Sequence, residues 1–431
     1  MGWLALDVGT SGVKAAVLDE ATGQPIAPVE KRSYALEQPV PHAMVIDPER
    51  LHAAVLDAAR VAVRNQSVHG IGFSVFTPGL ILLKADLQPL TPIITHLDRR
   101  ARLSAKRVWQ DCGDAFLNSN GNKPLPGGIS ALVWQELVQQ SPEWHKQVRY
   151  FLHLNSWLAL QWTGQTAFDP GNACFTGLTE WRSPRQWSAQ WCDYFQIQLE
   201  WLPPIKDGSH TVGELRNELV SALGLPRSIP VKIGFADTSS AVCAAQLQLN
   251  EVLHVVGTTQ VLACRTTQPV PSPSRLMRPL GLGNDFLHVA HNPVGGVALE
   301  WLYRLCFADV TESTYYADLL FQAMSRSTHV RLDPPYLGGD RLEIDARYAG
   351  LQNLSLSTDR MDVLIAVLQA MREGHKTAWH AMQFESNPHR IVLTGGGDRW
   401  VKRLLSEYTN VQVQMLEQAS LLGVWSLFSA R

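Results

Sequence analysis

This chain of 431 residues has little charge and no long apolar run. Charged residues make up 18%, below the usual quarter. The formal net charge of −2 argues against a nucleic-acid-binding protein, because such proteins usually carry a basic excess. No apolar stretch approaches the roughly 20 residues that span a bilayer, and the N-terminus lacks the basic and apolar segments of a secretory signal. We therefore expect a soluble cytoplasmic protein with neither a membrane nor a nucleic-acid partner.

Cysteine is also sparse, whereas tryptophan is abundant. The six cysteines are scattered, with no C-x-x-C pair and no histidine at zinc spacing, which indicates reduced and mostly buried thiols. Hydrophobic residues make up 45%, enough for large cores, and the length fits two or three domains. Many of the 14 tryptophans fall between residues 134 and 201. They predict a helical subdomain packed with aromatics, with a sugar-stacking wall as the alternative.

The most informative stretch is the N-terminal one, residues 3–19. Two runs rich in Val, Leu and Ala flank a tight Asp-x-Gly-Thr-Ser-Gly turn, which predicts a β-hairpin. Gly9 and Gly12 let the backbone bend sharply and come close to a ligand. Hairpins of this kind hold phosphate in the superfamily of actin, the heat-shock chaperone ATPases and the sugar kinases, and this stretch resembles theirs. The alternative is an ordinary glycine-containing hairpin with a surface aspartate.

The side chains around this turn suit a nucleotide phosphate. Thr10, Ser11 and backbone N–H groups can face phosphate oxygens. Asp7, at the end of the first strand, can hold the water shell of a magnesium ion. Lys14 adds a positive charge on the second strand.

The order of predicted elements indicates a duplicated α/β fold. The first half reads as strands near 3–8, 13–19 and 26–35, a helix from 47, a strand at 70–76, and a helical region over 101–165. After a Pro-containing link at 225–230, the second half reads as a strand at 231–237, a hairpin at 253–264, a helix at 360–385, a strand at 391–398 and a helix at 399–408. The second hairpin, with its Gly-Thr-Thr turn, weakly repeats the first.

Six stretches, taken together in this order, make the chain similar to the FGGY family of carbohydrate kinases over nearly its whole length. They are Asp7–Lys14, His96–Ala101, Thr163–Ala173, Gly234–Asp237 with Gly257–Thr259, Pro335–Arg341 and Thr394–Gly397. The resemblance implies an α/β fold of two ribonuclease-H-like (actin-like ATPase) domains flanking a cleft. Residues 1–228 are expected to bind the sugar and residues 229–431 the nucleotide.

The resemblance also implies an activity. The chain is expected to be an ATP-dependent, magnesium-requiring kinase that phosphorylates a hydroxyl of a small sugar or polyol, with ketopentoses such as xylulose or ribulose as first candidates. A monomer or a homodimer is expected. Asp237 matches the family's base, which takes the proton of the attacking hydroxyl. The alternative for Asp237 is the N-cap of the following helix.

Further residues carry over from the family motifs. Gly257, Thr258 and Thr259 are expected to hold the β- and γ-phosphates as a backbone anion nest, or else to form a simple turn. Gly395, Gly396 and Gly397 are expected under the adenosine, or else as a plain strand-to-helix loop. Asp398 and Trp400 are weaker candidates for contacts to the base or ribose.

The acceptor side matches the family less well. Asp98 and Arg100 match residues where the acid binds sugar hydroxyls, with a salt bridge or loop cap as the alternative, and His96 stands in place of a tryptophan. Ser74, a further substrate-binding candidate, opens the segment 74–79, which lacks the Gln and His of pentulose kinases. The glycerol kinase signature is absent, and Ser130 or Ala131 replaces a common lysine.

These departures keep a second hypothesis open: a kinase-like ATP- or sugar-binding protein with little or no catalysis. A chaperone-like ATPase is a third, but the chain has no segment that resembles a peptide-binding domain.

Overall fold

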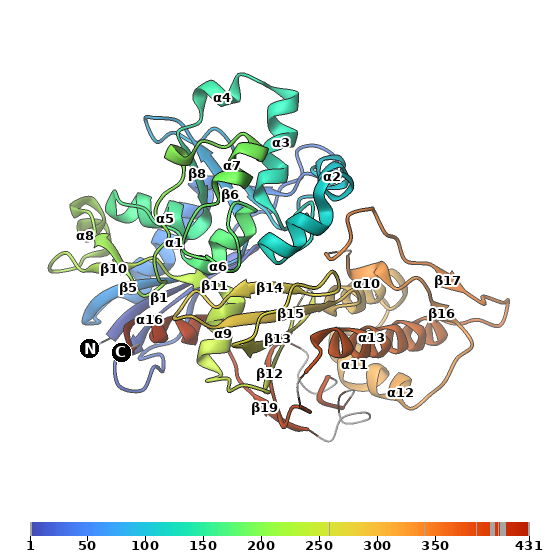
Figure 1. Ribbon diagram of the computed structural model, residues 1–431. Coiled ribbons are helices and arrows are strands. Elements are labelled where there is room, and N and C mark those ends of the chain that lie inside the picture. Colours follow the sequence, from blue (N-terminus) through green and yellow to red (C-terminus); the bar gives the residue numbers. More distant parts are fainter. Residues whose placement is uncertain are drawn as a thin grey trace.

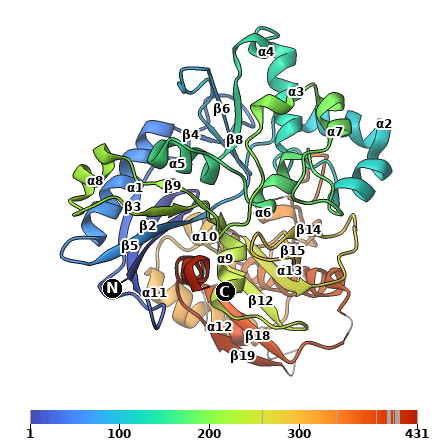
Figure 2. The same ribbon diagram turned by 60° about the vertical axis from the view of Figure 1, so that its left-hand side comes forward.

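Two large mixed sheets, each covered by helices, make up the computed structural model of the chain (Figure 1). The structure describes residues 2–257, 259–339, 341–384, 386–396, 401–403, 405 and 411–429. Figures 1 and 2 show the strands and helices of the first half on one side and the yellow-to-red second half on the other. No helix in the described ranges combines the length and the apolarity needed to cross a membrane.

The first sheet begins with the predicted hairpin. Its strands lie in the order β3 (Glu30–Ser33), β2 (Gly12–Asp19), β1 (Gly2–Val8), β5 (Val68–Val75), β10 (Pro230–Lys232) and β9 (Thr211–Glu214), with β11 (Phe235–Ala236) also on β5. Strands β1 and β2 are antiparallel, whereas β1 and β5 are parallel and set Asp7 beside Ser74. Helices α1 (Pro48–Ala62), α5 (Leu154–Thr163) and α8 (Asn217–Leu223) accompany this sheet. The predicted helix start at residue 47 is confirmed, since the Asp47 side chain caps α1.

The second sheet repeats the plan of the first. Its strands lie in the order β14 (Leu276–Pro279), β15 (Phe286–Asn292), β13 (Gln260–Thr266), β12 (Val252–Val256), β18 (Arg390–Gly395) and β19 (Gln412–Met415). Strands β12 and β13 form an antiparallel hairpin, and β12 runs parallel to β18. The run β15-β13-β12-β18-β19 therefore matches β3-β2-β1-β5-β10 in order and direction, which confirms the predicted duplication.

One boundary inference needs correction. The strand predicted at 231–237 was expected to open the second half, but β10 and β11 extend the first sheet by pairing with β5. Gly234 makes the close approach possible: its φ is +80°, and a Cβ there would lie 2.0 Å from the Phe73 carbonyl oxygen. A strand pattern does not specify which of two similar sheets it joins. The division of the chain into two domains at residue 228 stays a prediction.

The Trp-rich region forms a small sheet and a helical layer. Its strands are β4 (Val45–Ile46), β7 (Ile93–Thr95), β6 (Gly79–Leu83) and β8 (Tyr150–His153). Its helices are α2 (Arg102–Asn120), α3 (Ser130–Gln140), α4 (Trp144–Gln147), α6 (Pro170–Ala173) and α7 (Ala189–Phe195). Trp134, Trp191 and Trp201 are buried in one apolar cluster, as the core interpretation predicted. The six cysteines are free, as expected.

The helices of the second half are α9 (Asp237–Ala244), α10 (Gly296–Cys306), α11 (Glu312–Thr314), α12 (Leu320–Met324) and α13 (Arg360–Met382), and a small ribbon pairs β16 (Arg331–Leu332) with β17 (Leu351–Gln352). Short 3₁₀ segments lie at Cys174–Thr176, Leu199–Trp201, Tyr336–Gly338 and Gly423–Trp425, and a π-helical turn at Tyr315–Leu319. Helix α13 confirms the predicted helix over 360–385 and starts with a capping box between Asp359 and Asp362. Much of the helix predicted over 399–408 lies outside the described residues.

The chain ends back on the first sheet. The last helices, α15 (Ala419–Leu422) and α16 (Ser426–Ser429), pack on β1 and β2 through an apolar cluster that includes Leu421 and Leu427. The rings of Trp3 and Phe428 stack with centroids 4.2 Å apart. This return brings residues near 420 to the edge of the sheet where Asp7 lies.

Candidate active site

Two carboxylates meet at the carboxyl edge of the first sheet. Asp7 on β1 pairs with Ser74 on β5, and Ala236 on β11 pairs with Val75 on the same strand β5. Asp237 directly follows Ala236, so both aspartates lie at the same end of β5. Carboxyl ends of neighbouring parallel strands share one edge, the usual place for ligands in such sheets. Asp7 and Asp237 are close enough that the charge of Asp237 contributes to raising the pKa of Asp7. The two acids therefore lie near each other at this edge, and their joint role in one site stays a prediction.

Asp7 is held firmly in place. The residue is 7% exposed, and its side chain accepts hydrogen bonds from Ser74 Oγ (2.9 Å) and from Ser420 Oγ (2.6 Å). Lys14 Nζ lies 3.8 Å from Asp7 Oδ2. Burial raises the pKa of Asp7, while Lys14 and the two hydroxyls counteract that rise because they favour the ionised form.

The N-terminal turn is rigid. Gly9 N–H donates to the Gly12 carbonyl oxygen (2.9 Å), and the Tyr34 hydroxyl donates to the carbonyl oxygens of Gly9 and, at 3.2 Å, Gly12. A Cβ on Gly12 would lie 2.5 Å from the Arg32 carbonyl oxygen, so this position requires glycine. Ser11 is exposed in this turn, and its carbonyl oxygen accepts a hydrogen bond from Tyr34 N–H (3.3 Å).

The matching turn of the second sheet lies between β12 and β13. Gly257 N–H donates to the Thr259 carbonyl oxygen (3.0 Å). The glycine-rich turn after β18 lies beside it, because Gly396 N–H donates to the Val256 carbonyl oxygen (2.8 Å). Gly395 has φ +103°, and a Cβ there would lie 2.0 Å from that same oxygen. Thr258, Gly397, Asp398 and Trp400 are outside the described residues.

A cavity of about 220 Å³ joins the two turns. Thr10 of the first turn and Gly257 and Thr259 of the second line it, and Asp237 lies in its wall. The cavity thus brings together backbone turns suited to anions and a carboxylate suited to a hydroxyl.

Comparison with known proteins agrees with this geometry. The family model for the N-terminal domain of the FGGY family of carbohydrate kinases matches residues 2–244. The chain belongs to this family. Over 431 aligned residues it is 25% identical to the xylulose kinase of Bacillus subtilis (strain 168), covering 96% of this chain and 84% of that protein.

A second relative and a solved structure are also similar to this chain. The "Putative sugar kinase YoaC" of the same organism is 27% identical over 265 residues, which cover 60% of this chain and only 53% of that protein. The structure of ligand-bound xylulose kinase from Lactobacillus acidophilus matches with a TM-score of 0.89 at 22% identity, covering 99% of this chain and 88% of that one. These matches, with the repeated strand order, confirm the predicted pair of ribonuclease-H-like domains in this carbohydrate kinase.

Two residues that we predicted to bind the acceptor are engaged elsewhere. Asp98 is fully buried; it accepts hydrogen bonds from Met44 N–H (3.0 Å) and Arg100 N–H (2.9 Å) and pairs with the Arg100 guanidinium (3.0 Å). These contacts favour the alternative of a salt bridge and loop cap. Ser74 is also fully buried and donates to Asp7. His96, which we expected to be a packed histidine in place of the family's tryptophan, lines the cavity together with Asp237.

Sequence reasoning missed other residues of the site. Ser420 bonds Asp7 across 413 positions of sequence, and Thr77, Arg278 and His291 line the cavity. Arg341, the last residue of the Pro335–Arg341 family stretch, lines the cavity too. No local pattern marks these residues, because the sheets that bring them together pair over long distances in the chain.

Proposed function

We propose that this cavity transfers the terminal phosphoryl group of ATP to a hydroxyl of a small sugar or polyol, with xylulose and ribulose as the first acceptors to test. The observation that carries the proposal is the meeting of two glycine turns around Asp237 in one cavity. The relatives aligned over nearly the whole chain that are named xylulose kinases support the choice of acceptor.

In this proposal the two turns bind the phosphates. Phosphoryl transfer depends mainly on positioning and on stabilising charge. Gly257, Thr258 and Thr259 would hold the β- and γ-phosphates, and Gly9, Thr10, Ser11 and Lys14 would approach the γ-phosphate from the other sheet. Gly395 and Gly396 would lie under the adenosine, where the lack of side chains leaves the backbone accessible.

The residues present fit a magnesium ion. Mg²⁺ in kinases usually takes one or two carboxylates, waters and the phosphates themselves. Asp7 offers such a carboxylate, and no cluster of three or more His, Cys, Asp or Glu suited to a metal lies among the described residues. Asp7 would hold the ion's water shell, and bound Mg²⁺ would neutralise charge on the phosphates.

Asp237 has the geometry of a base. Its Oδ1 accepts from Thr238 N–H (2.6 Å) and Thr238 Oγ1 (3.1 Å), so Oδ2 is free, as far as the described residues go, to accept a substrate hydroxyl. In the proposed step that hydroxyl oxygen attacks the γ-phosphorus, the bond to ADP breaks, and the proton passes to Asp237. Closure of the two halves would exclude water.

The test is a coupled ADP-release assay over tetruloses, pentuloses, heptuloses, polyols and sugar acids. We expect ATP turnover to depend on one acceptor class, with sugar phosphate as the product. ATP binding measured by calorimetry without turnover on any acceptor would refute the proposal and support the binding-protein hypothesis.

A further inference from the structure

An arginine without a bonding partner faces the cavity. Arg278 lies on β14, is 3% exposed, and lines the cavity that contains Asp237. Its guanidinium carbon lies 5.8 Å from the ring centroid of Phe175. Within the described ranges, no residue forms a hydrogen bond or an ion pair with this guanidinium. A guanidinium stays charged in proteins and has five N–H donors, so its burial without an anion is unfavourable.

Asp169, the other carboxylate near Arg278, is already engaged. It accepts hydrogen bonds from the side chains of Asn155 (2.8 Å) and Asn172 (2.6 Å), and burial raises its pKa to about 6. Asp237 is needed at the acceptor hydroxyl. Neither acid therefore satisfies Arg278 fully.

The rest of the cavity adds positive charge and no further acid. Arg341 lines the same wall, and burial together with Arg99 and Arg278 lowers its pKa to about 10, even though Asp237 opposes this. His96 and His291 also line the cavity; burial and then Arg341 hold the pKa of both rings well below the usual value, so both stay neutral. Neutral imidazoles suit sugar hydroxyls. The lining therefore carries two guanidinium charges against the single carboxylate of Asp237.

The sheet register separates Arg278 from the phosphate turn. Arg278 pairs with Leu287 on β15, and Leu287 pairs with Arg265 on β13. Arg265 is five residues beyond Gln260, where β13 leaves the turn, so the Arg278 backbone lies about 17 Å along the strands and about 10 Å across them from that turn. Strand β14 instead contacts the first half, since Asn122 bonds both N–H and carbonyl of Met277 (2.9 and 2.8 Å). Arg278 thus belongs to the acceptor end of the cavity.

We propose that the acceptor is a sugar acid, a polyhydroxy carboxylate whose carboxylate pairs with Arg278 while one of its hydroxyls faces Asp237. The inference rests on the proposed kinase function of this cavity. Guanidinium and carboxylate match in a bidentate geometry, and a desolvated pair of this kind selects strongly against a neutral analogue. Arg341, which also borders Thr259 in an adjoining cavity, is shared between the acceptor and the phosphates.

The experiment compares acceptors that differ only at one end. Xylonate is compared with xylitol, and gluconate with glucitol. The panel also contains other aldonates and uronates of four to seven carbons with their alditols, and the neutral sugars xylulose and ribulose. We expect kcat/KM for the preferred acid to exceed that for its matched alditol by about 30-fold or more. Arg278→Gln should remove most of this preference and leave KM for ATP unchanged, while Arg278→Lys should retain part of it.

Arg304→Gln, on the exposed face of α10, is the matched control and should leave the preference intact; melting curves verify that each variant is folded. Turnover of neutral sugars at rates equal to or above those of acids would overturn this inference and leave the kinase function standing. An Arg278→Gln variant that weakens ATP and every acceptor equally would also overturn it. No turnover on any acceptor would refute the proposed function, and this inference with it.

Discussion

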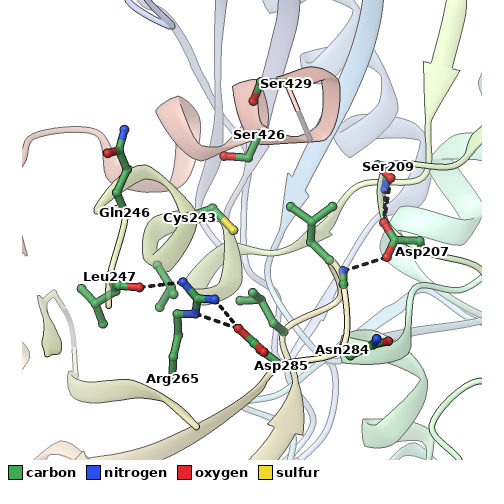
Figure 3. A pocket seen from close by; sticks show the side chains of 14 residues that line it. Asp207, Ser209, Cys243, Gln246, Leu247, Arg265, Asn284, Asp285, Ser426 and Ser429 are labelled. Carbon is green, nitrogen blue, oxygen red and sulfur yellow. Dashed lines mark hydrogen bonds and ion pairs between the residues drawn. The ribbon is translucent and has the colours of Figure 1, made fainter. Parts of the chain in front are cut away.

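The central cavity and a second, outer pocket differ in how their charged groups are satisfied. The outer pocket is larger, about 600 Å³ against about 220 Å³, and lies among α9, the loop after β14 and the C-terminal serines Ser426 and Ser429 (Figure 3). There, Arg265 pairs with Asp285 (3.1 Å from Nε) and donates to the Leu247 carbonyl oxygen (2.8 Å). Asp207 accepts from Gly283 N–H (2.8 Å) and Ser209 Oγ (2.7 Å).

In the central cavity, by contrast, the charged groups face the empty volume. Arg278 has no bonding partner among the described residues, and one oxygen of Asp237 accepts no bond from them. Polar groups that are satisfied by one another stabilise a fold, whereas those held apart from any partner favour a ligand. Unpaired charge, rather than pocket size, is therefore our reason for proposing the central cavity as the functional site.

The largest expected effect comes from comparing the removal of one carboxylate charge in the central cavity with the removal of one in the outer pocket. Asp237→Asn should reduce kcat about 10³-fold, because a positioned base contributes about 10² to 10⁴. Asp207→Asn in the outer pocket should leave kcat unchanged and reduce the free energy of unfolding by about 1 kcal/mol. Coupled ADP release and urea unfolding measure the two quantities. Equal losses of turnover in both variants would contradict the assignment of function to the central cavity rather than to the outer pocket.

A second contrast uses two glycines that both have positive φ. Gly395, beside the phosphate turn, has no room for a Cβ, whereas Gly283, in the outer pocket, has φ +70° and no atom within 4 Å of the place that a Cβ would occupy. Gly283→Ala should lower the unfolding free energy by about 1 kcal/mol, the usual cost of left-handed backbone. Gly395→Ala should cost about 3 kcal/mol or more, since the 2.0 Å contact forces the backbone apart.

The same Gly395→Ala variant should weaken ATP binding, measured by calorimetry at a temperature where it remains folded. Gly283→Ala should bind ATP like the unmodified protein. Normal ATP affinity in Gly395→Ala would mean that this turn does not contact the nucleotide.

The sequence predicted those parts of the site that local patterns specify. The turn at Gly9–Gly12, the repeated hairpin, the strand-tip position of Asp237 and helix α13 all follow from short-range periodicity and turn residues. The family motifs then supplied their order. Together they account for the described residues of the two turns that we propose as the phosphate-binding side of the cavity.

The parts that could not be predicted depend on long-range pairing. Ser420 reaches Asp7 only because α15 packs on β1, and Arg278 reaches the cavity through the β14–β15 pairing. The sequence around Asp98 is equally compatible with binding a sugar and with capping a loop. The buried contacts of Asp98 with Arg100 and Met44 favour the loop cap. Sequence spacing carries no information on which of two chemically reasonable partners an acid will meet.

The smallest expected effect separates two serines of the C-terminal segment. Ser420→Ala removes a hydroxyl that favours ionised Asp7, so the pKa of Asp7, already raised by burial, should rise further. If Asp7 acts as the anion, the acid limb of the kcat/KM profile should move to higher pH.

When the pKa of an acid is higher in the folded than in the unfolded state, the acid stabilises the fold at pH values below its unfolded-state pKa. This stabilisation is lost as the pH rises through the folded-state pKa. The loss of stability in Ser420→Ala should therefore be larger at pH 7 than at pH 4, whereas Ser426→Ala, in the outer pocket, should shift neither the rate profile nor the pH dependence of melting.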